Sequence, residues 1–315
     1  MEPKRSEAGI KWGIVSTIKA DEREILEFAA YHLELGAHRL YIHLDDPEQE
    51  TFDRLKAHPK IRVFACDEAY WRKRGKRPVK HQARQTANAT RLYRRARDVD
   101  WLIHIDVDEF LWPGPPLADQ LAALPADILC ARVRPIEALA GPEPLFKGFI
   151  PAGPEREATV ERLYPRFGAF VKGGFLSHLA GKLFVRTGLG PTTLKIHNVF
   201  VGDQMNPGET ELRDTLLCHN HAKNWDEWIA SFQYRLSQGS YRAELAPSRP
   251  REHGGLTLHE VLSTIHDSEG DAGLRAFYDE LCADTPSLRG ALEREGLLHR
   301  CELDLTAKYR KQFHG

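Results

Sequence analysis

The sequence predicts an α/β fold in which helices flank a mostly parallel sheet. Over the first 112 residues, short apolar runs alternate with segments of helical periodicity, as in βαβ units. The runs are nearly continuous in apolar residues, which is typical of parallel strands buried on both faces. Between residues 135 and 190 glycine and proline are frequent, so we expect antiparallel strands and long loops there. The end of the chain reads as helices.

The predicted elements alternate regularly in the first third of the chain. Ile25, Phe28 and Leu33 recur at helical spacing, and Gly36 stands where a glycine commonly ends a helix. Asp45 and Asp46 follow the second apolar run and close it. The strands are expected at 12–18, 39–44, 60–65 and 101–107, and the helices at 22–35, 48–58 and 81–97.

Later elements are less regular. We expect strands at 127–133 and 216–219 and a helix at 225–236. From Leu256 onward, helices are expected to be broken at Gly270, Gly273, Pro286 and Gly296. A chain of 315 residues, 42% hydrophobic and 28% charged, suffices for one large domain with a helical appendage. We therefore expect a main domain at 1–242 and a helical extension at 243–315.

Composition indicates the cellular location of the protein and excludes some classes of partner. The net charge of −1 gives no general attraction to nucleic acid, so no nucleic-acid partner is expected. No apolar run reaches the length of about 20 residues that spans a bilayer, and segment 1–11 lacks the apolar core of a secretory signal. The five cysteines are scattered without a CxxC pair, which indicates free thiols. These observations predict a cytoplasmic protein.

The sharpest motif is Asp106-Val107-Asp108, at the end of the fourth apolar run. In an extended segment the side chains at i and i+2 share a face, so both carboxylates could converge on one cation. Oxygen ligands suit hard ions such as Mg²⁺ or Mn²⁺, which also bind phosphate oxygens. The alternative is a solvated acidic turn; the position at the carboxyl end of a predicted strand favours the metal site.

Thr17 and Lys19 follow the first predicted strand, where ligands bind in open parallel sheets. The chain has neither a G-x-G-x-x-G fingerprint nor a G-x-x-x-x-G-K-[ST] loop there, which excludes the common dinucleotide and P-loop sites. Thr17 and Lys19 can still contact a nucleotide, although Lys19 could equally be a solvated residue before a helix.

A basic stretch runs from Ala69 to Arg97, with eleven lysines and arginines and no acidic residue. One interpretation is a solvated loop followed by a basic helix face. The other is contact with phosphates or with an anionic lipid surface, and therefore peripheral attachment to the inner face of a membrane.

Two histidines lie close together in the segment Cys218-His-Asn-His-Ala-Lys223. In an extended segment His219 and His221 would share a face, and either could complete an octahedral site with the two aspartates. A packed or solvated histidine pair is the alternative.

Four blocks of residues together resemble the family 2-like glycosyltransferases with a GT-A fold, close to family 92. The resemblance covers the chain from Trp12 to about Tyr241. Its most specific block, Ile105-Asp-Val-Asp-Glu-Phe-Leu111, is similar to the family's IDxDEF. The others are the segment Ile18–Gly36, then Gln82 with Asn88, and finally His219-x-x-x-Lys223 followed by Asp226-Glu-Trp228.

The resemblance implies a hexosyltransferase-like enzyme that uses a nucleotide-sugar, UDP- or GDP-linked, and a glycan or lipid-linked acceptor. Residues 12–112 would form the nucleotide-sugar-binding half and 113–242 the acceptor half. Asp106 and Asp108 would hold the metal and the diphosphate, with His219 as a further ligand. The remaining donor-binding residues would be Thr17, Lys19, Asp45 and Gln82.

Some positions depart from the family's pattern. Asn220 and Asn224 replace a tyrosine and a serine, and the segment from Lys19 to Glu22 is one residue longer than usual. The acceptor half matches only loosely. An inverting enzyme needs a carboxylate base near the acceptor hydroxyl, and the candidates are Glu109, Glu137 and Asp203.

Three other functions compete with this one. A phosphohydrolase of the haloacid-dehalogenase type also ends a strand in DxD, but usually in its first strand and without the glutamate that follows here at Glu109. A nucleotidyltransferase would have a similar fold and metal. A non-catalytic sugar-binding relic would have no need for Asp106, Asp108 and His219 together.

Overall fold

The computed structural model describes residues 9–313, so most of the polar segment 1–11 lies outside the described residues. The chain forms two compact units. Unit 1 comprises residues 1–134, 181–217 and 303–315, and unit 2 comprises 135–180 and 218–302. Unit 1 has segments on both sides of residue 242, and unit 2 includes residue 242 within its segment 218–302. The predicted division into 1–242 and 243–315 stays a prediction.

Four parallel strands form one side of the main sheet, in the order β3 (Ile61–Ala65), β2 (Arg39–Leu44), β1 (Trp12–Ile18) and β4 (Trp101–His104). All the residues of β1 and β4 are buried, as expected for strands covered on both faces. The predicted fold class, helices around a sheet that is parallel in its first part, is confirmed.

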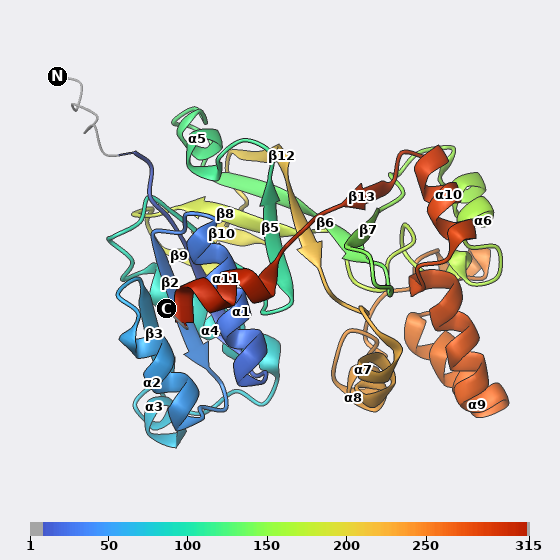
Figure 1. Cartoon of the computed structure of the whole chain (residues 1–315), viewed down its shortest axis with the longest axis horizontal. Helices are drawn as coiled ribbons and strands as arrows, with labels where there is room; N and C mark the ends of the chain where they lie inside the picture. Colours follow the sequence, from blue (N-terminus) through green and yellow to red (C-terminus); the bar gives the residue numbers. More distant parts are fainter. Residues whose placement is uncertain (1–8, 314–315) are drawn as a thin grey trace. The chain divides into compact units, whose positions relative to one another are not determined.

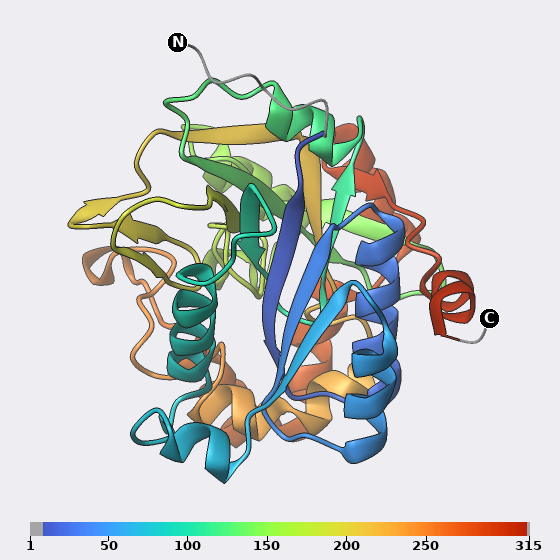
Figure 2. The ribbon, with the colours of Figure 1, turned by 90° about the vertical axis from the view of Figure 1, so that its left-hand side faces the viewer.

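Helices cover both faces of these strands, with α4 on one face and α1 and α2 on the other (Figure 2). Asp21 caps α1 by accepting a hydrogen bond from the Glu24 amide at 2.9 Å. Gly36 has φ of 100°, a conformation that L residues rarely adopt, which explains the glycine after this helix. The helices of this region are α1 (Glu22–Glu34), α2 (Gln49–Ala57), α3 (Glu68–Arg72), α4 (His81–Tyr93) and α11 (Leu305–Phe313).

Antiparallel strands extend the sheet beyond β4, where β8 pairs with β4 and with β6. Strand β12 pairs with β5 and β6. A separate small sheet has the order β11-β10-β9. The bounds are β5 (Glu109–Pro113), α5 (Leu117–Ala122), β6 (Cys130–Ala138), β8 (Lys182–Arg186), β9 (Thr192–Leu194), β10 (Val199–Val201), β11 (Gln204–Met205) and β12 (Glu209–His219).

Unit 2 is built mainly from helices around an aromatic core. Trp228, Phe277 and Tyr278 are buried there, with the Trp228 ring centroid 5.5 Å from that of Tyr278. Figure 1 labels its elements. They are β7 (Leu145–Gly148), α6 (Arg156–Leu163), α7 (Trp225–Ala230), α8 (Phe232–Ser237), α9 (Leu258–Cys282), α10 (Pro286–Arg294) and β13 (Leu298–Arg300), with short 3₁₀ turns at Gly168–Phe170 and Arg251–His253.

Several predicted boundaries were wrong. Strand β4 ends at His104, so Asp106-Val107-Asp108 lies in a turn and not in the strand. The predicted helix at 225–236 is two short helices that meet at Ser231. Helix α9 is bent at Gly270, whose φ of 60° is not helical, but it continues through Gly273.

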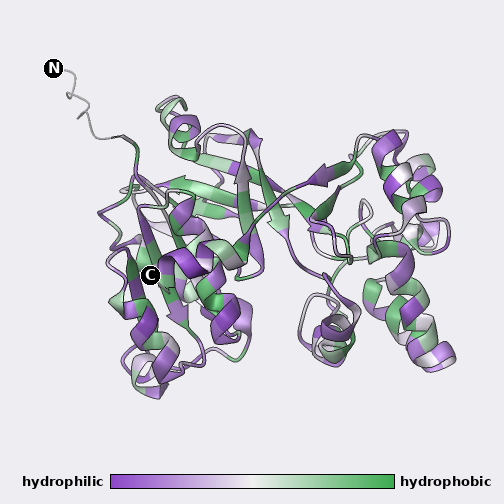
Figure 3. Ribbon diagram, in the orientation of Figure 1, coloured by the Kyte–Doolittle hydropathy of each residue, from purple (hydrophilic) through white to green (hydrophobic). Residues whose placement is uncertain are grey.

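The distribution of apolar side chains agrees with the sequence analysis. Figure 3 shows mainly hydrophobic residues along the central strands and hydrophilic residues on the outer faces of the helices. None of the helices in the described part of the chain is long and apolar enough to cross a membrane. All five cysteines are free and buried, which confirms the prediction of free thiols.

Candidate active site

Polar side chains gather at the carboxyl edge of the parallel strands in unit 1. Thr17 is the next-to-last residue of β1, Asp45 follows β2, and Asp106 comes two residues after β4. The strand registers pair Ile18 with Leu44, so β1 and β2 end together, and pair Val15 with His104, so β4 ends earlier and Asp106 follows it toward the same edge. This edge is where open parallel sheets bind ligands.

One face of α4 contacts all three strand ends. Polar residues recur there at helical spacing, at His81, Arg84, Gln85 and Asn88. The Asn88 side-chain amide donates to Thr17 Oγ1 at 3.2 Å, and Gln85 donates to Asp106. A single helix face thus holds the polar groups of β1, β2 and β4 in fixed positions.

Asp45 is a buried carboxylate surrounded by cations. Its side chain is 0% exposed and accepts from Arg84 Nε at 2.7 Å and from Arg77 Nη2 at 3.1 Å. Burial alone raises the pKa of Asp45, but hydrogen bonds from His81 and Arg84 and the charges of Arg84 and Arg77 bring it down to about 2. Asp45 is therefore ionised at every physiological pH, and part of the basic stretch neutralises it.

Asp106 is bound to a buried lysine. Lys182, on β8, has a side chain that is 0% exposed, and its Nζ lies 2.7 Å from Asp106 Oδ2 and 3.1 Å from Glu109 Oε2. Burial alone lowers the pKa of Lys182, but the two carboxylates raise it above its ordinary value, so the ammonium is permanent. Glu109 also accepts from the Asp106 backbone amide at 2.8 Å. The Lys182 ammonium and Glu109 thus hold the turn of the motif in place.

Two neutral histidines lie near this ammonium. Burial, and next the charge of Lys182, lower the pKa of His104 to about 4 and that of His197 to about 3. His197 also contacts the Gly181 carbonyl through Nδ1 at 3.0 Å. The surroundings of Lys182 therefore contain one fixed positive charge and two uncharged imidazoles at neutral pH.

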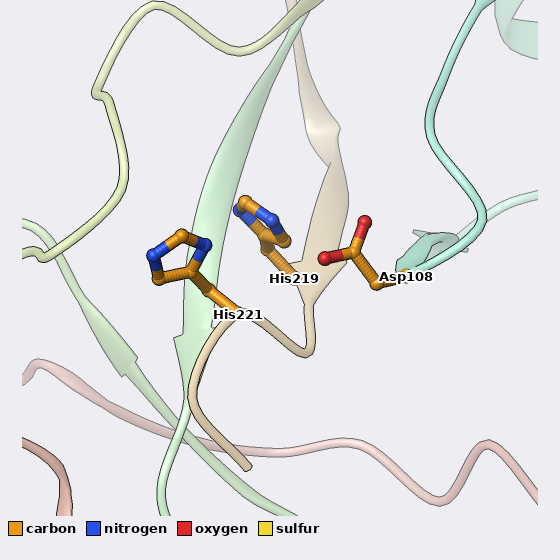
Figure 4. Close-up of side chains that lie close together, drawn as sticks. All are labelled: Asp108, His219 and His221. Atoms are coloured by element: carbon orange, nitrogen blue, oxygen red, sulfur yellow. The ribbon is translucent and has the colours of Figure 1, made fainter. Parts of the chain in front are cut away.

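Asp108 is half-buried in the turn that leads into β5, and His219 is the last residue of β12, the strand that pairs with β5. One oxygen of Asp108 and one ring nitrogen each of His219 and His221 lie within 4.8 Å of one another (Figure 4). A carboxylate and imidazoles are ligand types that suit a divalent ion, so these residues are a candidate metal-binding group.

The two histidines differ in their surroundings. His221 Nε2 lies 3.0 Å from Arg235 Nη1 and 3.1 Å from the Tyr241 hydroxyl. Because a guanidinium only donates, Nε2 must accept, and a neutral His221 then carries its proton on Nδ1. Neither nitrogen of such a ring offers a lone pair to a metal, so His219 is the better ligand of the two.

The other predicted site residues lie in varied surroundings. Lys19 is exposed and pairs with Asp46 at 3.1 Å, and Gln82 is half-buried in the first turn of α4. Glu137 is buried beside Lys147 and accepts from the Ser177 amide at 2.9 Å. Asp203 is exposed in the turn between β10 and β11.

The sequence analysis missed Gln85, Lys182 and the roles of Arg77 and Arg84. The polar residues 81, 84, 85 and 88 form a helical stripe in the sequence, and this signal could have indicated that α4 faces a polar region. Lys182 gave no such signal, because a lysine at the start of a short apolar strand is usually exposed, whereas the side chain of Lys182 is fully buried.

No family model and no curated protein matches the chain. Similar solved structures include the glycosyltransferase GlyE of Streptococcus pneumoniae TIGR4, at 18% identity and a TM-score of 0.27 over 39% of this chain and 30% of that one. The bifunctional glycosyltransferase WbbM matches at 17% identity and a TM-score of 0.27, over 42% and 24% of the respective chains.

A mycobacterial protein matches over more of its length, 81% of this chain and 88% of that one, at 15% identity and a TM-score of 0.36. The chain thus spans about a third or less of the two glycosyltransferases named. Likenesses this weak do not decide the activity, and the resemblance to family 92 stays a prediction. The function proposed below rests on the residues of this chain.

Proposed function

We propose that the chain is a metal-dependent glycosyltransferase, which moves a sugar from a nucleotide-sugar to a hydroxyl of a glycan or lipid-linked acceptor. The observation that carries this proposal is the position of Asp106-Val107-Asp108, in a turn at the carboxyl end of a central parallel strand, next to other polar strand ends. Open parallel sheets bind nucleotides at this edge. A diphosphate leaving group needs positive charge beside it.

The nucleoside part of a UDP- or GDP-linked donor would bind at Thr17 and Asp45, with Lys19 and Gln82 at the margin. Side chains of α4 donate hydrogen bonds to Thr17 and Asp45, so both residues are oriented before a donor binds. Asp106 would accept from a donor hydroxyl. Its other contacts, to Lys182 and Gln85, fix its direction.

The metal would bind to Asp108 and His219, and a bound ion would stabilise the charge of the departing diphosphate. One imidazole ligand favours Mn²⁺ over Mg²⁺, because Mg²⁺ prefers oxygen ligands and water. Asp106 is less suited to the metal than Asp108, because its Oδ2 is already bound to the Lys182 ammonium. His221 would lie beside the metal site without binding the ion.

The candidate bases are not equivalent. Glu109 and Glu137 are each 1% exposed and paired with a lysine, and the Lys147 charge and backbone amides bring the pKa of Glu137 below its ordinary value despite burial. A carboxylate with a lowered pKa is a weak base. Asp203 is the exposed one of the three. If single alanine substitutions at all three left turnover intact, the base would lie elsewhere or the reaction would retain configuration.

The test is thermal melting with a panel of nucleoside diphosphates, with Mn²⁺, with Mg²⁺ and without metal. A ligand at a hundred times its Kd stabilises the folded state by about 2.7 kcal/mol, which raises the Tm by about 5 °C for a chain of this size. We expect one nucleotide to give such a shift, larger with Mn²⁺ than with Mg²⁺.

Asp108→Ala should lose the metal-dependent part of the shift, and His219→Asn should lose more of it than His221→Asn. Asp119→Ala, at an exposed aspartate of α5, is the matched control and should respond as the wild type does. No shift with any nucleotide would contradict the proposal and favour a hydrolase or a non-catalytic protein. Transfer of a nucleotidyl group, detected in the products, would identify a nucleotidyltransferase.

A further inference from the structure

The end of α3 and the loop that links it to α4 form the most basic run of residues in the first third of the chain. We define the basic loop as residues 72–80, with the sequence Arg-Lys-Arg-Gly-Lys-Arg-Pro-Val-Lys. Six of its nine residues are basic and none is acidic, and no acidic residue follows before Asp98. The side chains of Arg72, Lys73, Lys76 and Lys80 belong to exposed residues.

Two of the arginines fix the loop to unit 1. Arg74 lies over the Tyr70 ring, 3.6 Å from its centroid, and donates to the Tyr70 carbonyl at 2.7 Å. Arg77 pairs with the buried Asp45. Arg72, Lys73 and Lys76, by contrast, make no ion pair with any residue in the range 9–313, so their charges face solvent without compensation.

An exposed apolar side chain lies near the end of the basic loop. Val79 is 86% exposed, the largest exposure among the large hydrophobic residues that the structure describes. Its backbone is nevertheless fixed, because Arg84 Nη1 donates to the Pro78 carbonyl at 3.0 Å and to the Val79 carbonyl at 2.7 Å. The loop therefore exposes a valine whose neighbours in the sequence are mostly basic.

We propose that the basic loop is a docking surface for an anionic lipid membrane. Anionic headgroups attract lysine and arginine, and a branched aliphatic side chain can enter the boundary between headgroups and acyl chains. A soluble phosphate or a nucleic acid would explain the cations but would give an exposed valine no apolar surroundings. The net charge of the whole chain is −1, so the attraction must come from this local surface.

The position of the loop gives docking a consequence for the enzyme. The loop follows β3 and contacts Asp45, so it lies at the carboxyl edge of the parallel strands, where the candidate donor site is found. Docking would bring this edge to the lipid surface. This inference does not depend on the proposed reaction, because membrane binding is measured without donor or acceptor.

The test is co-sedimentation of the full chain with vesicles of phosphatidylcholine alone or with about a third phosphatidylglycerol. We expect binding to the anionic vesicles only, weakened by added salt. Each basic residue near an anionic surface contributes about fivefold to the partition coefficient. Lys73→Glu/Lys76→Glu should therefore lower it at least about 25-fold, and Val79→Ser should lower it severalfold without any change in charge.

The matched control is Lys56→Glu/Lys60→Glu, which changes the charge equally at two exposed lysines before β3, at the opposite edge of the strands. It should bind as the wild type does. Equal loss of binding in the control, or binding that is the same for both kinds of vesicle, would overturn the proposal. So would a Lys73→Glu/Lys76→Glu variant that keeps vesicle binding but loses nucleotide binding, since the loop would then serve a soluble phosphate.

Discussion

The two units each bury one lysine beside a glutamate, and the two pairs differ in what surrounds them. Lys147 in unit 2 donates to the carbonyls of Gly174 and Leu281 at 2.7 and 2.5 Å, and its partner Glu137 accepts backbone amides. Lys182 in unit 1 is as buried, but it shares its charge between Glu109 and Asp106, whose side chain is 31% exposed.

The two lysines differ in role: Lys147 stabilises the interior of unit 2, whereas Lys182 acts on the candidate site. All the partners of Lys147 that are described above are buried or belong to the backbone, so its charge is used within unit 2. The charge of Lys182 reaches a carboxylate in contact with solvent, at the strand edge where ligands bind. A buried ion pair by itself is weak evidence for function, and the exposure of one partner is what distinguishes the two.

The largest effect on stability is expected for Lys147→Met. It leaves Glu137 charged and buried without its partner, which costs about 3–5 kcal/mol. Urea denaturation measures the loss. The double variant Lys147→Met/Glu137→Gln should recover most of it, because no buried charge is then left alone. Equal stability of the single and double variants would mean that the pair is not coupled.

Lys182→Met is expected to cost somewhat less stability, about 2–4 kcal/mol, because it leaves the buried Glu109 without its ammonium while Asp106 can regain water. The same variant should weaken nucleotide binding at least tenfold, since the turn of the motif is no longer held. Calorimetric titration with the nucleotide identified by melting measures this. If Lys147→Met weakened nucleotide binding of the folded protein as strongly, the distinction between the two lysines would be wrong.

The smallest effect concerns pH. His104 and His197 have pKa values of about 4 and 3 in the folded protein, below the ordinary value of 6.5. The unfolded chain therefore binds more protons than the folded one below pH 6.5, so stability is full above that pH and falls as the pH drops toward 4. Each histidine contributes up to about 1.4 kcal/mol per pH unit in this range.

Denaturation at pH 7.5, 6 and 5 measures that slope. His104→Asn should reduce the slope by the share of one histidine, while a substitution at the exposed His253 should leave it unchanged. A wild-type stability that is the same from pH 7.5 to 5 would show that the pKa values of these imidazoles are not lowered in the folded protein.

Much of the parallel region could be predicted, because continuous apolar runs and helical periodicity are local signals. Strands β1 to β3 and helix α1 lie within a residue or two of the predicted bounds. Strand β12 was recognised only at 216–219, because its first part is exposed at most positions and carries no apolar run. The points at which the chain passes from one unit to the other have no local signal in the sequence.

The site was predicted in part for the same reason. The sequence identifies Asp106, Asp108 and Asp45 because each follows an apolar run. Their partners Lys182, Gln85 and Arg84 come from elements distant in sequence, and long-range pairing cannot be read from spacing. The expectation that Asp106 and Asp108 share a face was based on an extended segment, whereas the motif follows the end of β4 and includes a turn, so it stays a prediction.

Helix α11 has a consequence for how the protein is made. It lies against α1, where Arg23 Nη2 donates to Thr306 Oγ1 at 3.0 Å and Lys311 pairs with Glu34 at 2.5 Å, and Arg54 donates to the Tyr309 hydroxyl at 3.1 Å. A ribosome synthesises α1 well before α11. During translation the face of α1 that α11 covers therefore stays exposed until α11 has been synthesised, and a holding chaperone would find a binding site on that face of α1.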